Sequence, residues 1–217
     1  NDFLNKPIDR VEFSARVKNM LSLRAGQKYL ADRALHLADL VDEQTREIRE
    51  REKELVYRLS RAAEFRDPET GAHIQRMAHY SQLIARRLGL GAVVERLVLE
   101  AAPMHDVGKI GIPDQILLKP GKLTEAEFNE MKKHTTLGYQ TLSWAEKRMG
   151  GHNDFLRIGA LIAYTHHERW DGKGYPRGLA GEDIPRAGRL MALADVYDAL
   201  TSERCYKKAF PHEKAVQ

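Results

Sequence analysis

Two residue pairs in this chain have the types and spacing that metal chemistry needs. They are His105-Asp106 and, 61 residues later, His166-His167. Imidazole nitrogens and carboxylate oxygens together suit borderline divalent ions. Lys109 adds an ammonium group beside the first pair. A positive charge near metal ions is unfavourable unless an anion such as a phosphate group also binds. We therefore expect a multinuclear metal site for phosphate chemistry, whereas Lys109 alone would fit a lysine at a helix C-terminus.

Other candidate ligands are scattered along the chain and are weaker one at a time. Glu69 and His73 are four residues apart, which puts them on one face of a helix, although such a pair is more often exposed surface. His134 alone would more often be structural. Asp195 and Asp198 lie among small and apolar residues, where a buried carboxylate must be paired or metal-bound. The spacing leaves open which of these two aspartates binds metal.

Together these candidates form a donor set of five histidines and up to four carboxylates, with no useful thiolate. Such a set excludes a zinc-finger type of site and fits two or three ions of the iron, manganese, cobalt or nickel kind. Clustered ions about 3.5–4 Å apart can clamp a phosphate group. Arg204 and Lys207 are three residues apart and on a helix would grip an anion, although alone they fit a solvated basic face.

The elements that must position these residues are predicted to be helices. Residues 67–217 show no sustained alternation of apolar and polar side chains, so we expect an all-α bundle. Thr124 and Glu127 form a capping-box pattern that opens the helix carrying His134. Residues 26–66 lack proline and repeat apolar residues at alternating spacings of three and four, which predicts a long linker helix. That helix would form a two-stranded coiled coil or, alternatively, lie on its own domain.

Composition argues against several classes of protein. The net charge of +4 is too small to indicate a nucleic-acid polymer as partner. No apolar run approaches the roughly 20 residues of a membrane span, so we expect no membrane insertion. With Cys205 as its one cysteine the chain can form no internal disulfide, and a reducing, cytoplasmic compartment is expected. The chain starts without methionine and stops in what looks like a beginning helix, so we expect a fragment that is truncated at both ends.

Over residues 60–217 the chain resembles the HD-GYP family, a bacterial branch of the HD-domain metal-dependent phosphohydrolases. The resemblance rests on residues 66–73, 105–114, 117–123 and 166–179, and Gly174-Tyr175-Pro176 is the element that gives the family its name. It implies an all-helical HD-domain bundle and hydrolysis of the bacterial second messenger cyclic di-GMP to pGpG and then GMP. Two alternatives stay open, which are a cyclic-dinucleotide receptor or docking module with little turnover, and a phosphodiesterase for another substrate such as cyclic GMP-AMP.

The resemblance also implies roles for individual residues. Asp106 would bridge two ions and Lys109 would sit beside the scissile phosphate, so these two are the expected catalytic residues. Of the two aspartates, the family pattern selects Asp195 as the ligand. Two or three ions, iron or manganese, would bind, and Glu69 is typical of members that hold a third. The implied metal ligands are Glu69, His73, His105, Asp106, His134, His166, His167 and Asp195. The implied substrate-binding residues are Lys109, Tyr175, Arg204 and Lys207.

Residues 1–25 resemble the end of a response-regulator receiver domain, with a last strand and a Lys6-Pro7 turn followed by a helix. The implied organisation is a receiver remnant at 1–25, a linker helix at 26–66 that pairs in a homodimer, and an HD-GYP domain at 67–217. The Gly174-Tyr175-Pro176 element would offer a docking site for a diguanylate-cyclase domain. The chain departs from the family at Cys205, where proline is more usual, and at Met104, where leucine is; neither change removes a ligand.

Overall fold

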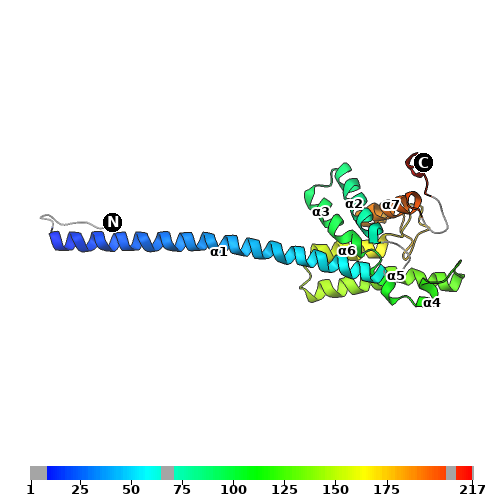
Figure 1. Ribbon diagram of the computed structural model, residues 1–217, viewed down its shortest axis with the longest axis horizontal. Coiled ribbons are helices and arrows are strands. Elements are labelled where there is room, and N and C mark those ends of the chain that lie inside the picture. Colours follow the sequence, from blue (N-terminus) through cyan, green and yellow to red (C-terminus); the bar gives the residue numbers. More distant parts are fainter. Residues whose placement is uncertain (1–8, 65–70, 204–208, 217) are drawn as a thin grey trace. The chain divides into compact units, whose positions relative to one another are not determined.

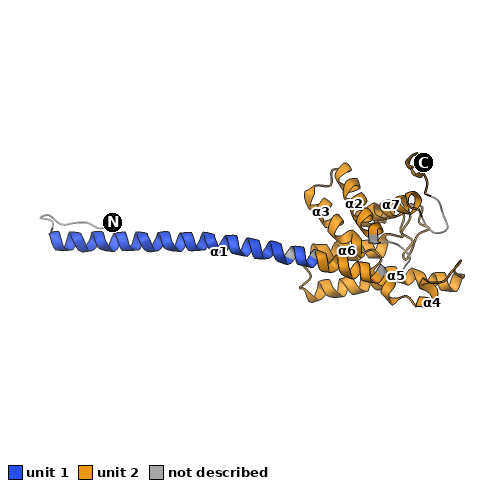
Figure 2. Ribbon diagram, in the orientation of Figure 1, with its two compact units in different colours: residues 1–52 blue, residues 53–217 orange. Residues whose placement is uncertain are grey.

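The computed structural model describes residues 9–64, 71–203 and 209–216 of the 217-residue chain. In these ranges the chain forms helices joined by turns, without a strand apart from one isolated bridge between Asp171 and Ala180. The all-α prediction is confirmed. Residues 1–52 and 53–217 form two compact units, which are coloured separately in Figure 2. No helix of the described part is both long and apolar enough to cross a membrane.

Helix α1 (Arg10–Glu64) covers residues 26–64 of the stretch 26–66 that was predicted as a linker helix, and it begins earlier than predicted. Asp9 precedes its first residue and caps it, since Oδ1 of Asp9 accepts the backbone N–H of Val11 at 2.7 Å and so satisfies a free donor of the first turn. Three arginine–glutamate pairs spaced four residues apart support its solvent-facing surface. Many of its apolar side chains are nevertheless exposed, with Leu30 at 65% and Leu37 at 52%, although Ala63 near its end is buried.

The second unit contains the remaining helices (Figure 1). The α-helices are α2 (Gly71–Arg87), α3 (Ala92–Ala101), α4 (Asp114–Leu117), α5 (Glu125–Arg148), α6 (Asp154–Thr165), α7 (Arg186–Thr201) and α8 (His212–Ala215). Three short 3-10 turns lie between them, which are η1 (Ala102–Met104), η2 (Val107–Gly111) and η3 (Gly181–Asp183).

The core of this unit forms where α2, α3, α6 and α7 pack together, while α5 packs on α6 and on η2. Two glycines permit the closest approaches. A side chain at Gly108 would collide with the backbone carbonyl of His134, and one at Gly188 would collide with Thr165. Gly108 therefore lets η2 lie directly on α5, and Gly188 lets α7 lie directly on α6. The central buried apolar residues are Met77, Ala101, Met104, Ile162, Ala163 and Met191.

The predicted capping box at the start of α5 is confirmed. The Thr124 hydroxyl accepts the N–H of Glu127, and the Glu127 carboxylate accepts the N–H of Thr124 at 2.7 Å. Lys119 donates to both carboxylate oxygens of Glu127, at 2.8 and 2.6 Å. The hydrogen bond from Lys119 and those from Thr124 lower the pKa of Glu127 to about 2. These contacts fix the first turn of the helix that carries His134.

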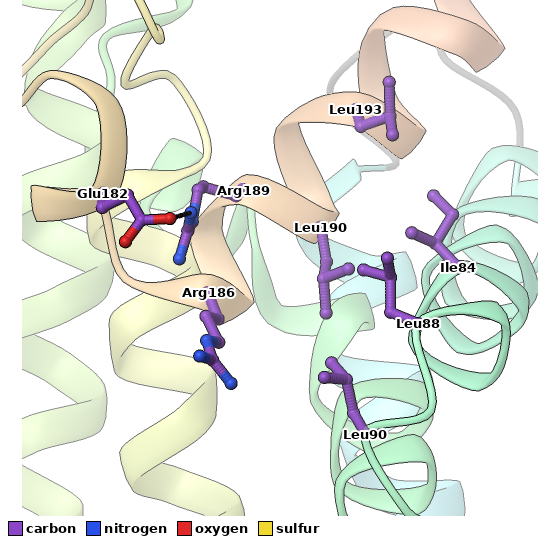
Figure 3. A pocket seen from close by; sticks show the side chains of 8 residues that line it. All are labelled: Ile84, Leu88, Leu90, Glu182, Arg186, Arg189, Leu190 and Leu193. Carbon is purple, nitrogen blue, oxygen red and sulfur yellow. Dashed lines mark ion pairs between the residues drawn. The ribbon is translucent and has the colours of Figure 1, made fainter.

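A groove of about 420 Å³ lies between α2, η3 and α7 (Figure 3). Its apolar wall consists of Ile84, Leu88, Leu90, Leu190 and Leu193. Glu182, Arg186 and Arg189 form its polar end, where Nη1 of Arg189 lies 3.8 Å from Oε1 of Glu182. None of these lining residues belongs to the predicted metal or substrate site.

Candidate metal centre

The His105-Asp106 pair lies at the junction of two 3-10 turns. His105 ends η1, where its N–H bonds to the carbonyl of Ala102, and Asp106 begins η2, where its carbonyl accepts the N–H of Lys109. Only 1% of His105 and 7% of Asp106 is exposed. Both residues are therefore buried, and Nε2 of His105 lies 3.2 Å from Oδ2 of Asp106.

Three further histidines converge on the same carboxylate. Asp106, His134, His166 and His167 place potential ligand atoms within 4.8 Å of one another. Oδ1 of Asp106 lies 3.2 Å from Nε2 of His134 and 3.5 Å from Nε2 of His166. Nε2 of His134 and Nε2 of His166 are themselves 3.4 Å apart. Residues from η2, α5 and the end of α6 thus meet at one point.

Backbone carbonyls fix the tautomers of three of these imidazoles. Nδ1 of His105 lies 3.0 Å from the carbonyl oxygen of Ala102, Nδ1 of His134 lies 2.7 Å from that of Met131, and Nδ1 of His166 lies 3.1 Å from that of Ile162. A carbonyl oxygen only accepts, so each Nδ1 carries the proton and each Nε2 presents a lone pair.

This arrangement fits a bound cation. Nε2 of His134, Nε2 of His166 and Oδ1 of Asp106 are then three lone-pair atoms that face one another without a proton between them. Oδ1 of Asp106 is buried and accepts no hydrogen bond from the described residues. Buried acceptors need a partner, and a divalent ion is one that all three can share. The chemistry of the donor set thus agrees with the metal site predicted from the sequence.

A hydrogen-bonded chain orients another predicted ligand, His73 on α2. Nδ1 of His73 donates to Oδ2 of Asp198 on α7 at 2.7 Å, and both residues are buried. Arg76 donates to both oxygens of the same carboxylate, from Nε to Oδ1 at 2.6 Å and from Nη2 to Oδ2 at 3.0 Å. The imidazole ring of His73 lies 5.6 Å from that of His105. A carboxylate that accepts from one histidine nitrogen is the usual support for a metal ligand at the other.

The family model described as "HD domain" matches residues 57–217. The chain belongs to the HD-domain family. Among curated proteins, it is 49% identical over 215 residues to "Cyclic di-GMP phosphodiesterase response regulator RpfG" of Xanthomonas campestris pv. campestris, with 99% of this chain and 55% of that protein covered.

Two relatives from Vibrio cholerae are also similar. A "Probable cyclic di-GMP phosphodiesterase" is 43% identical over 222 residues, covering 99% of this chain and 50% of the relative. A "3'3'-cGAMP-specific phosphodiesterase 2" is 46% identical over 168 residues, covering 77% of this chain and 31% of the relative. The chain thus spans about half the length of the first two relatives and less of the third.

Burial and neighbouring charges keep Asp106 and the clustered histidines in the protonation states that bind metal. Burial would raise the pKa of Asp106, but Lys109, whose Nζ lies 2.7 Å from Oδ2, and His105 together hold that pKa well below its usual range. Burial lowers the pKa of His134 to about 4 and lowers the pKa of His167 more strongly still. Near neutral pH the carboxylate is therefore charged and these imidazoles are neutral, as metal ligation requires.

Glu168 organises the loop that carries Tyr175 in the HD domain. Its carboxylate is 3% exposed and accepts the backbone N–H groups of Arg177 at 2.8 Å and Leu179 at 2.9 Å. The N–H of Tyr175 donates to the carbonyl of His167 at 3.1 Å, and the two rings lie 4.7 Å apart. Sequence reasoning assigned Glu168 no role, and its one signal was a charged residue directly after the buried histidine doublet.

The structure brings together most of the predicted site residues that it describes. Asp106 is surrounded by His105, Lys109 and the three histidines of the cluster, with His73 beside His105 and Tyr175 beside His167. Asp195 on α7 is half-buried, and its charge contributes to the raised pKa of Tyr175. Glu69, Arg204, Cys205 and Lys207 lie outside the described residues.

Proposed function

We propose that this chain is the hydrolase part of an HD-GYP phosphodiesterase that cleaves cyclic di-GMP to pGpG, GMP or both. The observation that carries the proposal is the convergence of Asp106 with imidazole lone pairs, beside the ammonium group of Lys109. The Gly174-Tyr175-Pro176 element supports the choice of substrate, as do the names of two relatives that align with 99% of this chain at 49% and 43% identity.

Two or three divalent ions, iron or manganese, would bind in the proposed centre. Asp106, with both oxygens facing imidazoles, would bridge two of them, and a third would need Glu69. The further ligands would be His73, His105, His134, His166, His167 and Asp195. When bound, such ions act as Lewis acids toward a phosphate group and lower the pKa of coordinated water.

The residues around the centre have separate tasks in the proposed reaction. The Lys109 ammonium, only 13% exposed, would stabilise charge that develops on the phosphate oxygens, where low exposure to water strengthens its effect. Burial and the charges of Asp106 and Asp195 raise the pKa of Tyr175, so its hydroxyl stays protonated and can donate a hydrogen bond to the substrate. We assign Arg204 and Lys207 to the grip on phosphate because arginine and lysine suit that anion.

The proposal is tested by measuring metal content and cyclic di-GMP turnover on one anaerobically purified sample. Two or three iron or manganese ions per chain, with formation of pGpG or GMP, are expected. Asp106→Asn should abolish turnover, whereas Asp154→Asn, which changes an exposed aspartate paired with Arg157, should leave it unchanged. Turnover at the wild-type rate in Asp106→Asn would show that the reaction does not require Asp106.

A cyclic GMP-AMP is the second candidate substrate, because the relative named for 3'3'-cGAMP is 46% identical to this chain. A panel of cyclic dinucleotides at equal concentration separates the two, since the preferred substrate will show the higher kcat/KM. Tight binding of cyclic di-GMP by fully metallated protein, without product after hours, would instead indicate a receptor.

We also propose that residues 26–66 pair with those of a second copy as a coiled coil. Helices in water rarely remain stable through propensity alone, and this one exposes Leu30, Leu37, Val41 and Ile48 at heptad-like spacing. Changing Leu37 and Val41 together to lysine should convert the dimer to a monomer in analytical ultracentrifugation. A matched change of exposed Asp32 and Asp39 to lysine should not do so.

The wider setting follows from the same proposal. As the output domain of a cytoplasmic two-component response regulator, the chain would follow a receiver domain whose last residues are 1–25, and it would meet diguanylate-cyclase domains through Gly174-Tyr175-Pro176. Pull-down of a purified cyclase domain by wild-type protein, with loss in a Tyr175→Ala variant, tests the docking. Cell fractionation with a cytoplasmic marker tests the location.

A further inference from the structure

The beginning of α5 places an aromatic ring and an ammonium group next to the metal centre. The ring of Phe128 meets the ring of Tyr175 edge to face, with centroids 6.1 Å apart. Nζ of Lys132, one turn further along the helix, lies 4.7 Å from the centroid of Phe128 and 5.8 Å from that of Tyr175. Because Tyr175 also lies against His167, the aromatic rings lead outward from the metal cluster to Phe128.

Phe128 and Lys132 have properties that the fold of this helix does not require. Phe128 is 42% exposed, so much of its ring faces solvent instead of the core. Lys132 donates a hydrogen bond to Oδ1 of Asn129 at 3.1 Å but forms no ion pair with any carboxylate in the described ranges. Its neighbour Lys133 points elsewhere and pairs with Glu130. The ammonium of Lys132 is thus available for an anion.

A cyclic dinucleotide offers partners for both groups. It contains two phosphates and two bases, and only one phosphate can occupy the metal centre at a time. The other half of the molecule must then lie outside the centre, where it needs an apolar surface for a flat base and a positive charge for a phosphate. Aromatic side chains stack on any base because every base has a π-face, and lysine pairs with phosphate as a point charge.

We propose that Phe128 and Lys132 form a second recognition subsite, in which the Phe128 ring packs against one base and the Lys132 ammonium pairs with the phosphate that is not cut. The inference rests on the proposed function and adds the residues that select a dinucleotide over a simple diester. Neither residue would contact the reacting phosphorus, so their contribution appears in substrate binding and not in the chemical step.

Kinetics with two substrates test the role of Phe128. Phe128→Ala should raise the KM for cyclic di-GMP roughly 5- to 150-fold, the range given by about 1–3 kcal/mol per stacked base, with kcat nearly unchanged. Phe128→Tyr keeps the ring and should restore the KM. Methyl p-nitrophenyl phosphate, a diester without a base, should be cleaved equally by all variants. Trp144→Ala, which removes another exposed aromatic residue of α5, is the matched control and should change neither substrate.

The charge of Lys132 is tested against that of Lys133. Lys132→Ala should raise the KM for cyclic di-GMP roughly 5- to 10-fold at low salt, and the difference from wild type should shrink as salt screens the pair. Lys133→Ala removes the same charge from the same turn and should have little effect. Equal effects of the two lysine variants would show that the substrate responds to the positive charge of the helix as a whole. That result would overturn the assignment of Lys132 to the subsite.

Other outcomes separate the subsite from the proposed function. If Phe128→Ala lowers kcat for both substrates equally, the ring supports Tyr175 or the fold and the subsite is refuted. If wild type cleaves methyl p-nitrophenyl phosphate but no cyclic dinucleotide, the proposed substrate is wrong. In that case, calorimetry of cyclic di-GMP binding tests the subsite by itself. Weaker binding by Phe128→Ala than by wild type would support the subsite, and unchanged binding would refute it.

Discussion

The buried bond between His73 and Asp198 predicts that one oxygen atom beside a proposed metal ligand controls metal affinity. Asp198→Asn keeps the shape of the side chain but replaces one acceptor oxygen with an NH₂ donor. Arg76 donates to both oxygens, from Nε to Oδ1 at 2.6 Å and from Nη2 to Oδ2 at 3.0 Å, and Oδ2 also accepts from Nδ1 of His73. The remaining oxygen keeps the shorter bond from Nε, so the new NH₂ replaces Oδ2, loses the bond from Nη2 and faces Nδ1 of His73. Nδ1 must then give up its proton, which moves to Nε2 and occupies the lone pair that would bind a metal ion.

The expected loss follows from the role of such supporting groups. Removing a carboxylate that orients a metal-binding histidine typically lowers affinity about 10- to 100-fold, which corresponds to about 1.4–2.8 kcal/mol. Burial of both residues places this case toward the upper end, because water does not replace the missing bond.

Competition between the protein and a chromogenic chelator for Mn²⁺ measures this affinity. Asp154→Asn, an exposed aspartate on α6, is the control for the loss of a negative charge. Circular dichroism and thermal unfolding in the presence of chelator show whether the variant is folded before metal is added. A folded Asp198→Asn protein with wild-type Mn²⁺ affinity would refute the link between Asp198 and the metal ligand His73.

Three other perturbations test separate parts of the fold. Glu168→Gln leaves one acceptor for two backbone N–H groups, so KM for cyclic di-GMP should rise about 5- to 10-fold while metal content stays constant. Glu127→Gln should lower the melting temperature above pH 4.5 but not near pH 2, as measured by melting curves at several pH values. The lowered pKa of Glu127 stabilises the wild type above pH 4.5, and this stabilisation is lost as the pH falls from 4.5 to about 2. Gly108→Ala should destabilise the fold by at least about 3 kcal/mol in urea titrations, since the added β-carbon would collide with the backbone of α5. Gly26→Ala is the contrasting change, because its β-carbon has no neighbouring atom and the alanine should stabilise α1 by up to about 1 kcal/mol.

Much of the architecture was predictable because it depends on local patterns. The absence of strand-like alternation indicated an all-helical domain, and the sequence Thr124 to Glu127 predicted a helix start that the structure confirms. The clustering of His105, Asp106 and the His166-His167 doublet was anticipated from residue chemistry alone. Helix periodicity and donor type are properties of short segments, so they can be read without knowing the tertiary contacts.

The supporting contacts could not be predicted because they join segments far apart in the sequence. Asp198 lies 125 residues from His73, and nothing in either segment indicates that the two side chains meet. The carbonyl groups that fix the histidine tautomers belong to the backbone and leave no mark in the sequence. Glu168 acts on backbone N–H groups of a loop whose course depends on the close approach of Gly174 to the chain at His167 and Glu168.

The two aspartates of α7 give the last prediction, because the helix assigns them different surroundings. Asp198 is 1% exposed and its two oxygens are taken by His73 and Arg76, which leaves it poorly placed to bind an ion directly. Asp195, three residues earlier, is half-buried, and its charge helps to raise the pKa of Tyr175, whose ring lies against that of His167. We therefore expect Asp195 to be the ligand, with Asp198 in support.

This division predicts two different losses on metal titration. Asp195→Asn should lower the number of tightly bound ions per chain by one, as measured by mass spectrometry of desalted protein, while the ions that remain keep their affinity. Asp198→Asn should keep the stoichiometry at saturating Mn²⁺ and lower the affinity. If Asp195→Asn retained the full complement of ions and Asp198→Asn lost one, the roles would be reversed, and α7 would hold metal through the carboxylate that the structure places against His73.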